Sequence, residues 1–132
     1  MITKTEFEQL ARFRRALRHF LRFSELAARE EGLTPQHHQM LLAIKGMPGR
    51  DWATITELAE ALQLHHNAIV QLVDRAAALD LVVRAANPAD RRIVQVRLTP
   101  TGEHKLDKLT AMHRDELRRL GEDLATILPP NA

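Results

Sequence analysis

The stretch from residue 56 to residue 102 constrains the fold most, because it reads as two short helices followed by two strands. Thr56 is placed to cap a first helix of about two turns, after which Gln63-Leu64 turns the chain. A second helix begins near His65 or His66. The inward-facing positions of both helices are apolar: Leu58, Ala59 and Leu62 in the first, and Ile69, Leu72, Val73 and Ala76 in the second. This pattern is typical of a helix-turn-helix.

The outer face of the second helix carries side chains that can read DNA bases. In a helix-turn-helix, the amino-terminal turns of this helix enter the major groove. Asn and Gln side chains pair there with adenine edges, and His donates to guanine or to phosphate. The residues of this helix that we expect to contact DNA are His65, His66, Asn67, Gln71 and Arg75. A merely solvated face is the alternative, because residues 56–80 carry one Arg against four carboxylates.

A basic hairpin is predicted after the second helix. Residues 81–84 read as one strand, and residues 93–98 alternate between apolar and polar as a second strand. Four arginines against one aspartate leave this hairpin with a net charge of +3: Arg84, Arg91, Arg92 and Arg97 against Asp90. A basic hairpin beside a major-groove helix can reach phosphates or the minor groove. We expect the Asp90 carboxylate to hold the guanidinium group of Arg92 in place.

Long amphipathic helices are predicted near both ends of the chain, over residues 5–31 and 101–128. Apolar residues recur in each helix at alternating spacings of three and four, which keeps them on one face. The first helix would be about 39 Å long, which exceeds the core of a small domain. We therefore expect both helices to pair with a second copy of the chain, while residues 54–100 contact DNA. Packing over a core within one chain is the alternative.

Composition excludes several classes of protein. The 132 residues suit a single domain, and the lack of cysteine excludes disulfides, zinc–thiolate sites and thiol-based redox sensing. One serine, no tyrosine and no cluster of glycines lead us to expect neither an enzyme nor a cofactor. No apolar run is long enough to span a membrane, so a soluble cytoplasmic protein is expected. The net charge of +2 is a weak indication of an anionic partner.

Several short motifs together resemble the MarR family of winged-helix transcriptional regulators. They are Leu58-Ala59-Glu60, Leu72-Val73-Asp74-Arg75, Leu81-Val82-Val83-Arg84, and Asp90-Arg91-Arg92 followed by Val96-Arg97-Leu98-Thr99-Pro100-Thr101-Gly102. The resemblance implies a mainly α-helical fold with a small β-hairpin, in which long N- and C-terminal dimerisation helices flank a winged helix-turn-helix. It also implies a homodimer that binds a pseudo-palindromic operator in double-stranded DNA, usually as a repressor. A small aromatic or anionic effector would release the DNA.

The resemblance also assigns roles to single residues. Asp90 and Arg92 match the family's wing pair, Arg84 its basic residue before the wing, and Arg75 its recognition-helix arginine. Three departures are present. Asp80 stands where the family usually has Gly, so we expect a different cap at that helix end. The recognition helix opens with His-His-Asn, so base preference is not carried over, and without cysteine the peroxide-sensing branch does not apply.

The effector pocket is expected to be edged by polar or aromatic side chains between helices, namely Arg18, His19, Trp52 and His113. Each also suits a structural role, and a lone Trp after a loop is typical of a lid on the core. Two other functions stay open. A winged-helix module could bind a protein instead of DNA, which the acidic helix pair favours. A metal-responsive regulator is suggested by seven histidines, although His104 and His113 fall on opposite faces of their helix and no metal site is predicted.

Overall fold

The computed structural model describes residues 1–128, which form eight elements of secondary structure. In chain order these are α1 (Lys4–Glu30), α2 (Pro35–Lys45), β1 (Trp52–Ala53), α3 (Ile55–Leu62), α4 (His66–Ala78), β2 (Val82–Ala86), β3 (Val94–Leu98) and α5 (Pro100–Ile127). The two long helices and the small hairpin of the expected fold are therefore confirmed.

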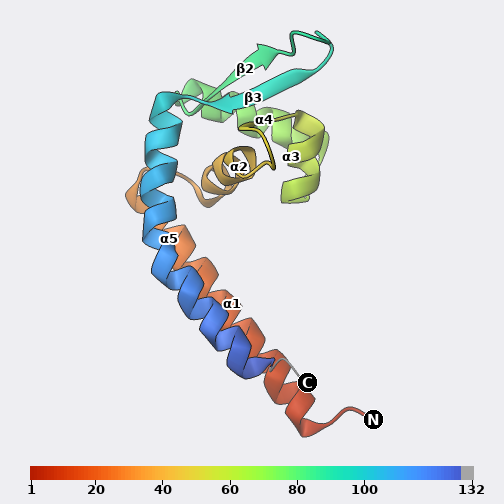
Figure 1. The fold of residues 1–132 in the computed structure, drawn as a ribbon, viewed down its shortest axis with the longest axis vertical. Coiled ribbons are helices and arrows are strands. Elements are labelled where there is room, and N and C mark those ends of the chain that lie inside the picture. The colour runs from red at the N-terminus through yellow and green to blue at the C-terminus, as the bar shows by residue number, and fades with distance from the viewer. Residues whose placement is uncertain (129–132) are drawn as a thin grey trace.

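The elements divide into an arm and a head. The arm consists of α1 and α5, which lie side by side and extend away from the other elements, with the N-terminus at the far tip (Figure 1). The head consists of residues 35–98, in which α2, α3 and α4 pack against the strands. No helix within residues 1–128 is long and apolar enough to cross a membrane.

Threonine side chains begin four of the five helices within residues 1–128, and each accepts a hydrogen bond from a backbone N–H three residues on: Thr3, Thr34, Thr54 and Thr99. The cap predicted at Thr56 is wrong. Thr54 caps α3, because Thr54 and Glu57 form a reciprocal capping box. The short strand β1 lies at Trp52–Ala53, just before that cap.

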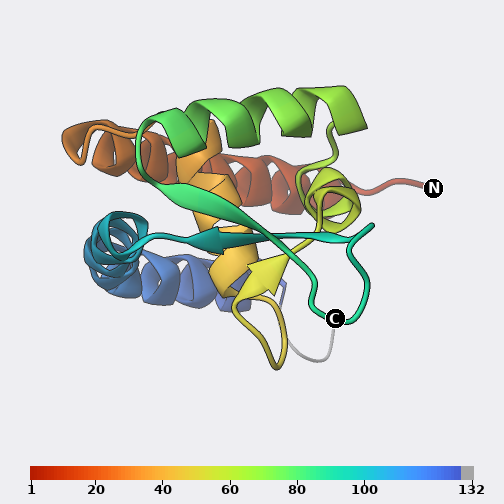
Figure 2. The same cartoon turned by 90° about the horizontal axis from the view of Figure 1, so that it is seen from above.

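The strands form an antiparallel sheet in the order β1-β3-β2 (Figure 2). Arg97 in the middle strand pairs with Trp52 on one side and with Val83 on the other. The first hairpin strand runs over Val82–Ala86 and not over residues 81–84 as predicted. Leu81 lies outside the ladder because its backbone N–H closes the end of α4 by donating to Ala76.

The end of α4 is a Schellman motif. The backbone N–H of Leu81 donates to the Ala76 carbonyl over 2.9 Å, and that of Asp80 donates to the Ala77 carbonyl over 3.0 Å. Asp80 has φ +59°, the left-handed conformation that glycine adopts most easily. The expectation of a different cap is therefore wrong, since Asp80 takes the backbone conformation that a glycine would supply.

The hydrophobic core lies mainly in the head, where apolar side chains of α2, α3, α4 and the sheet are almost fully buried: Met40, Leu41, Ile44, Leu58, Ile69, Leu72, Val73, Val82 and Val96. The arm is less covered. Phe7, Leu10 and Leu117 retain 62%, 61% and 61% of their accessible surface. The single chain thus leaves part of the apolar stripe on each long helix in contact with solvent.

Candidate nucleic-acid interface

The outer face of α4 carries the side chains that were expected to contact DNA. His65 is the N-cap residue, and His66 begins the helix. His65, His66, Asn67, Gln71 and Arg75 are all exposed, whereas Ile69, Leu72, Val73 and Ala76 are buried. The predicted inward and outward faces of this helix are therefore confirmed. The exposed side chains form one polar surface beside the wing, which is the β2–β3 hairpin with its tip, residues 82–98.

The wing tip holds the predicted Asp90–Arg92 pair. Asp90 Oδ1 accepts from Arg92 Nε over 3.0 Å, and Asp90 Oδ2 accepts from Arg92 Nη2 over 3.0 Å. The Arg92 backbone N–H also donates to Asp90 Oδ1 over 3.1 Å. The Arg92 side chain and backbone lower the pKa of Asp90, so its carboxylate stays ionised. The Arg92 side chain remains 90% exposed, so the guanidinium group is oriented without being covered.

Arg84 lies at the base of the wing, where it contacts α4. Its Nη2 atom lies 2.5 Å from Asp74 Oδ1 and donates to the Val70 carbonyl over 3.4 Å. The guanidinium group therefore ties β2 to the recognition helix, and Asp74 balances its charge.

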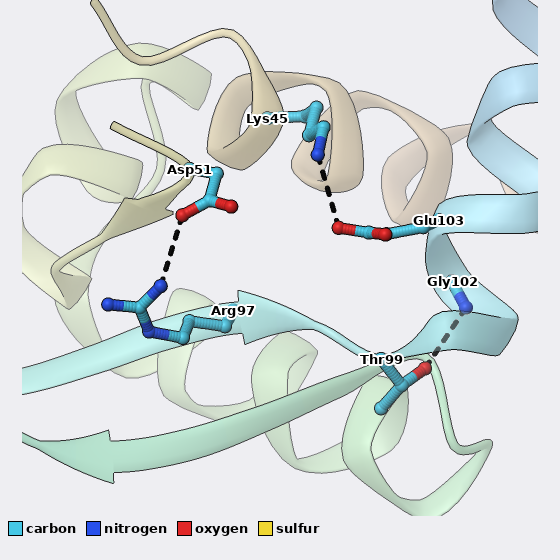
Figure 3. Close-up of polar contacts among 6 residues, drawn as sticks. All are labelled: Lys45, Asp51, Arg97, Thr99, Gly102 and Glu103. Atoms are coloured by element: carbon cyan, nitrogen blue, oxygen red, sulfur yellow. Dashed lines mark hydrogen bonds and ion pairs between the residues drawn. The ribbon is translucent and has the colours of Figure 1, made fainter. Parts of the chain in front are cut away.

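Arg97, on the middle strand β3, is likewise paired with a carboxylate of the same chain. Its Nη1 donates to Asp51 over 3.0 Å, as Figure 3 shows, and its Nη2 donates to Gln95 over 2.9 Å. With Asp51 and Asp74 included, four arginines face three aspartates, which lowers the local net charge from +3 to +1. Arg91 forms no ion pair within residues 1–128, so Arg91 and Arg92 are the cations that the wing presents most freely.

A groove of about 480 Å³ lies between the start of α3, the start of α4 and the wing. It is lined by Thr54, Ile55, Thr56, His66, Arg92, Ile93 and Val94. The amino terminus of α3 carries partial positive charge, and His66 and Arg92 add donors, so the groove suits an anionic phosphate. The sequence pattern predicts His66 and Arg92 as DNA-contacting residues, but it does not predict Thr56 as one. The Thr54-x-x-Glu57 capping pattern could have located this helix end.

The four residues expected to edge an effector pocket do not converge. Arg18 and His19 are exposed on α1 and line two separate shallow grooves. Trp52 lies half-buried in β1, with the Arg50 guanidinium carbon 4.1 Å from its ring centroid. His113 lies between arm and head, 2.9 Å from Ser24 Oγ. Within residues 1–128 no group of three or more His, Asp or Glu side chains is arranged to hold a metal ion.

Polar contacts also join the head to the arm. Lys45 Nζ on α2 donates to Glu103 on α5 over 3.1 Å, and this hydrogen bond raises the pKa of Lys45 (Figure 3). Thr99 accepts from the Gly102 backbone N–H over 3.0 Å and donates to the Asp80 carbonyl over 2.6 Å. The start of α5 is thereby fixed to both α2 and the end of α4.

A helix-turn-helix followed by a wing with a braced arginine, and mounted on two long helices, defines a winged-helix transcriptional regulator. A profile of the MarR family matches residues 31–93, which include α2, α3, α4 and β2. The chain is similar to the MarR family of transcriptional regulators over this segment, and its fold is that of a solved MarR family regulator.

Individual relatives agree with this assignment. The chain is 29% identical over 128 residues to YsmB of Bacillus subtilis (strain 168), an uncharacterized HTH-type transcriptional regulator, covering 92% of this chain and 84% of YsmB. The crystal structure of AbsC, a MarR family regulator from Streptomyces coelicolor, aligns with a TM-score of 0.76 and 24% identity, covering 99% of this chain and 86% of AbsC. A mutant of S. aureus MepR bound to an oligodeoxyribonucleotide aligns with a TM-score of 0.68 and 18% identity, covering 83% and 79% of the two chains.

Proposed function

We propose that this protein is a homodimeric repressor that binds a pseudo-palindromic operator in double-stranded DNA and is released by a small effector. The observation that carries the DNA-binding part is the groove between α4 and the wing, because it joins an exposed polar helix face to the braced Arg92. The MepR mutant of the same fold was crystallised with an oligodeoxyribonucleotide, which supports this use of the fold.

The exposed residues of α4 divide by chemistry. Asn67 and Gln71 can form paired hydrogen bonds with adenine edges, so they supply base discrimination. His65, His66 and Arg75 contact phosphates or guanine from the same face. A phosphate lies in the groove between Thr56, His66 and Arg92.

The wing arginines divide by position. Arg91 and Arg92 at the tip enter the minor groove, where the negative potential favours guanidinium groups. Arg84 and Arg97 at the base act mainly by fixing the wing to the head, because each is paired with a carboxylate of the same chain. The wing therefore supplies affinity through its tip and depends on its base for orientation.

The arm supplies the second half of the operator-binding unit. Its exposed Phe7, Leu10 and Leu117 are covered by the arm of a second copy, which places two recognition helices on one duplex. A small aromatic or anionic effector binds in the groove on α1 that holds Arg18, where Arg14, Arg18 and Arg22 flank Leu17 and Leu21. We expect the complex to act in the cytoplasm.

The test is a titration of the protein against duplex DNA from upstream of its own gene, with a scrambled duplex of equal length as control. With about six phosphate contacts, affinity should fall on the order of a thousandfold between about 50 and 200 mM salt. The upstream duplex should bind more tightly than the scrambled one at every salt concentration, and aromatic acids should weaken it. Salt-insensitive binding, or none, would contradict the proposal and favour a protein-binding module.

A further inference from the structure

Three histidines pack together where the head meets the arm. His37 and His38 lie on α2 and are each only 4% exposed. The His38 ring centroid lies 5.1 Å from that of His113 on α5. His113 is itself held by the Leu109 carbonyl at 2.6 Å and by Ser24 Oγ at 2.9 Å. Phe20 and Phe23 of α1 cover the other sides of the His113 ring.

His37 has no hydrogen-bond partner for either of its buried ring nitrogens. Buried polar atoms without partners are unfavourable, and a charged ring in this position would be more so. The unpartnered ring nitrogens of His37 thus destabilise the packed state, and a proton on this ring would destabilise it further.

The groups around the cluster do not balance a positive charge. Arg75 of α4 is the charged group that acts on His37, and His113 of α5 is the one that acts on His38. From α1 the cluster meets Ser24 and the two phenylalanine rings. None of the ion pairs within residues 1–128 joins a carboxylate to any of the three histidines.

We propose that His37 and His38, buried where α2 meets His113 of α5, form a proton-sensitive joint between head and arm. Uptake of protons by these two buried rings separates α2 from α4 and α5, and so changes the angle at which the arm holds the head. The pH response of the contact between head and arm is a property of this chain alone. The consequence of that response for DNA binding rests on the proposed function.

The direction of the effect follows from the buried state. Burial first, and then Arg75, lower the pKa of His37, and burial followed by His113 lowers the pKa of His38. Once the joint opens, both rings return to the ordinary value of about 6.5. The open state therefore binds more protons below about pH 6.5, and each proton favours opening by up to about tenfold per pH unit. Above about pH 6.5 the joint should not respond to pH.

The experiment follows hydrogen exchange of the full chain at about pH 7.5 and about pH 5.5, with intrinsic exchange rates corrected, in peptides from α2 and from residues 106–113. His37→Met with His38→Phe removes both titrating rings while keeping their bulk. His104→Gln, an exposed position on α5, is the control. Wild type and control should lose protection at least about tenfold at the lower pH, and the double variant less than about threefold.

Equal protection of the wild type at both pH values would overturn the proposal, as would an unchanged pH response in the double variant. If the double variant does not fold, the single variants decide, because each should remove about half of the logarithmic response. Affinity for the operator should fall with the same pH dependence in the wild type and not in the variant. Lack of DNA binding at about pH 7.5 would contradict the proposed function alone, since the exchange result does not involve DNA.

Discussion

At the scale of single residues, the wing tip combines a negative and a positive side chain on a surface proposed to face DNA. The Asp90 carboxylate repels phosphates, yet it accepts three hydrogen bonds from Arg92 and so limits the positions that the guanidinium group can take. Exposed ion pairs contribute little to folding stability, so the pair should matter for binding more than for stability.

Arg92→Ala should weaken binding to every DNA sequence by about tenfold and reduce the salt slope by about one contact. Arg119→Ala is the matched control, because Arg119 is an exposed, paired arginine on the arm. Asp90→Asn should also weaken binding, although it removes a negative charge, because Arg92 loses its bidentate partner. Duplex titrations at several salt concentrations measure both effects, and tighter binding by Asp90→Asn would show that the brace has no role.

Gly102 shows a different constraint, which is steric. A Cβ atom at this position would overlap the carbonyl oxygen of Leu81, whereas one at Gly121 would meet nothing within 4 Å. Gly102→Ala should therefore lower the free energy of unfolding by about 1–3 kcal/mol. Gly121→Ala should raise it by up to about 1 kcal/mol, because alanine favours the helix. Urea denaturation measures both, and equal stability of the two variants would exclude the steric contact.

At the scale of elements, the wing and the recognition helix behave as one unit because Arg84 links β2 to α4. The family resemblance gives Arg84 a place among the DNA-contacting residues, whereas its contacts with Asp74 and Val70 indicate a role in positioning. These two roles predict opposite results when Asp74 is changed.

Asp74→Asn decides between the roles of Arg84. If Arg84 fixes the wing, Asp74→Asn should weaken DNA binding about as much as Arg84→Gln, by several-fold, and the double variant should add little. If Arg84 contacts a phosphate, removal of the competing carboxylate should strengthen binding. The coupling in folding stability should be below about 1 kcal/mol, because the Arg84 and Asp74 side chains are 35% and 59% exposed. A double-mutant cycle measures the coupling between Arg84 and Asp74 twice, once from DNA affinities and once from urea denaturation.

The elements that could be predicted from the sequence are those specified by neighbouring residues. The apolar stripe of α4 and the Asp90–Arg92 pair both join positions at most a few residues apart. The cap of α3 was misplaced although Thr54 and Glu57 are also close, because Thr56 offered a second threonine at a similar position.

The contacts that could not be predicted join distant segments. Arg97 and Asp51 lie 46 positions apart, and they meet because β1 adds to the free edge of β3. A two-residue strand has no periodicity that would reveal this pairing. The charge of the wing was overestimated for the same reason, since Asp51 and Asp74 lie outside the hairpin in sequence. The burial of His37 and His38 likewise depends on helices that approach from both ends of the chain.

At the scale of the whole molecule, the exposed apolar side chains of the arm point to a second copy. Leu10→Glu should shift the protein to monomers, because Leu10 is 61% exposed in one chain and would be covered in the dimer. Leu79→Glu changes a leucine that is 55% exposed at the end of α4 and should leave the dimer intact. Sedimentation equilibrium measures the change, and the monomer should retain binding to a half-site while losing affinity for the full operator. An unchanged dimer in Leu10→Glu would place the interface elsewhere.

The single helix α5 begins at the sheet, where Thr99 and Gly102 fix it, and continues without a break along the arm. Its 28 residues make it about 42 Å long, so in the proposed dimer it would act as a lever that pivots at the contact between the two copies. A tilt of about 5° at one end would then displace the other by about 4 Å, close to the rise of one base pair. If the proposed dimer forms, the angle between its two arms would set the spacing between the recognition helices. A molecule that changed this angle slightly would then shift the two heads out of register with the DNA.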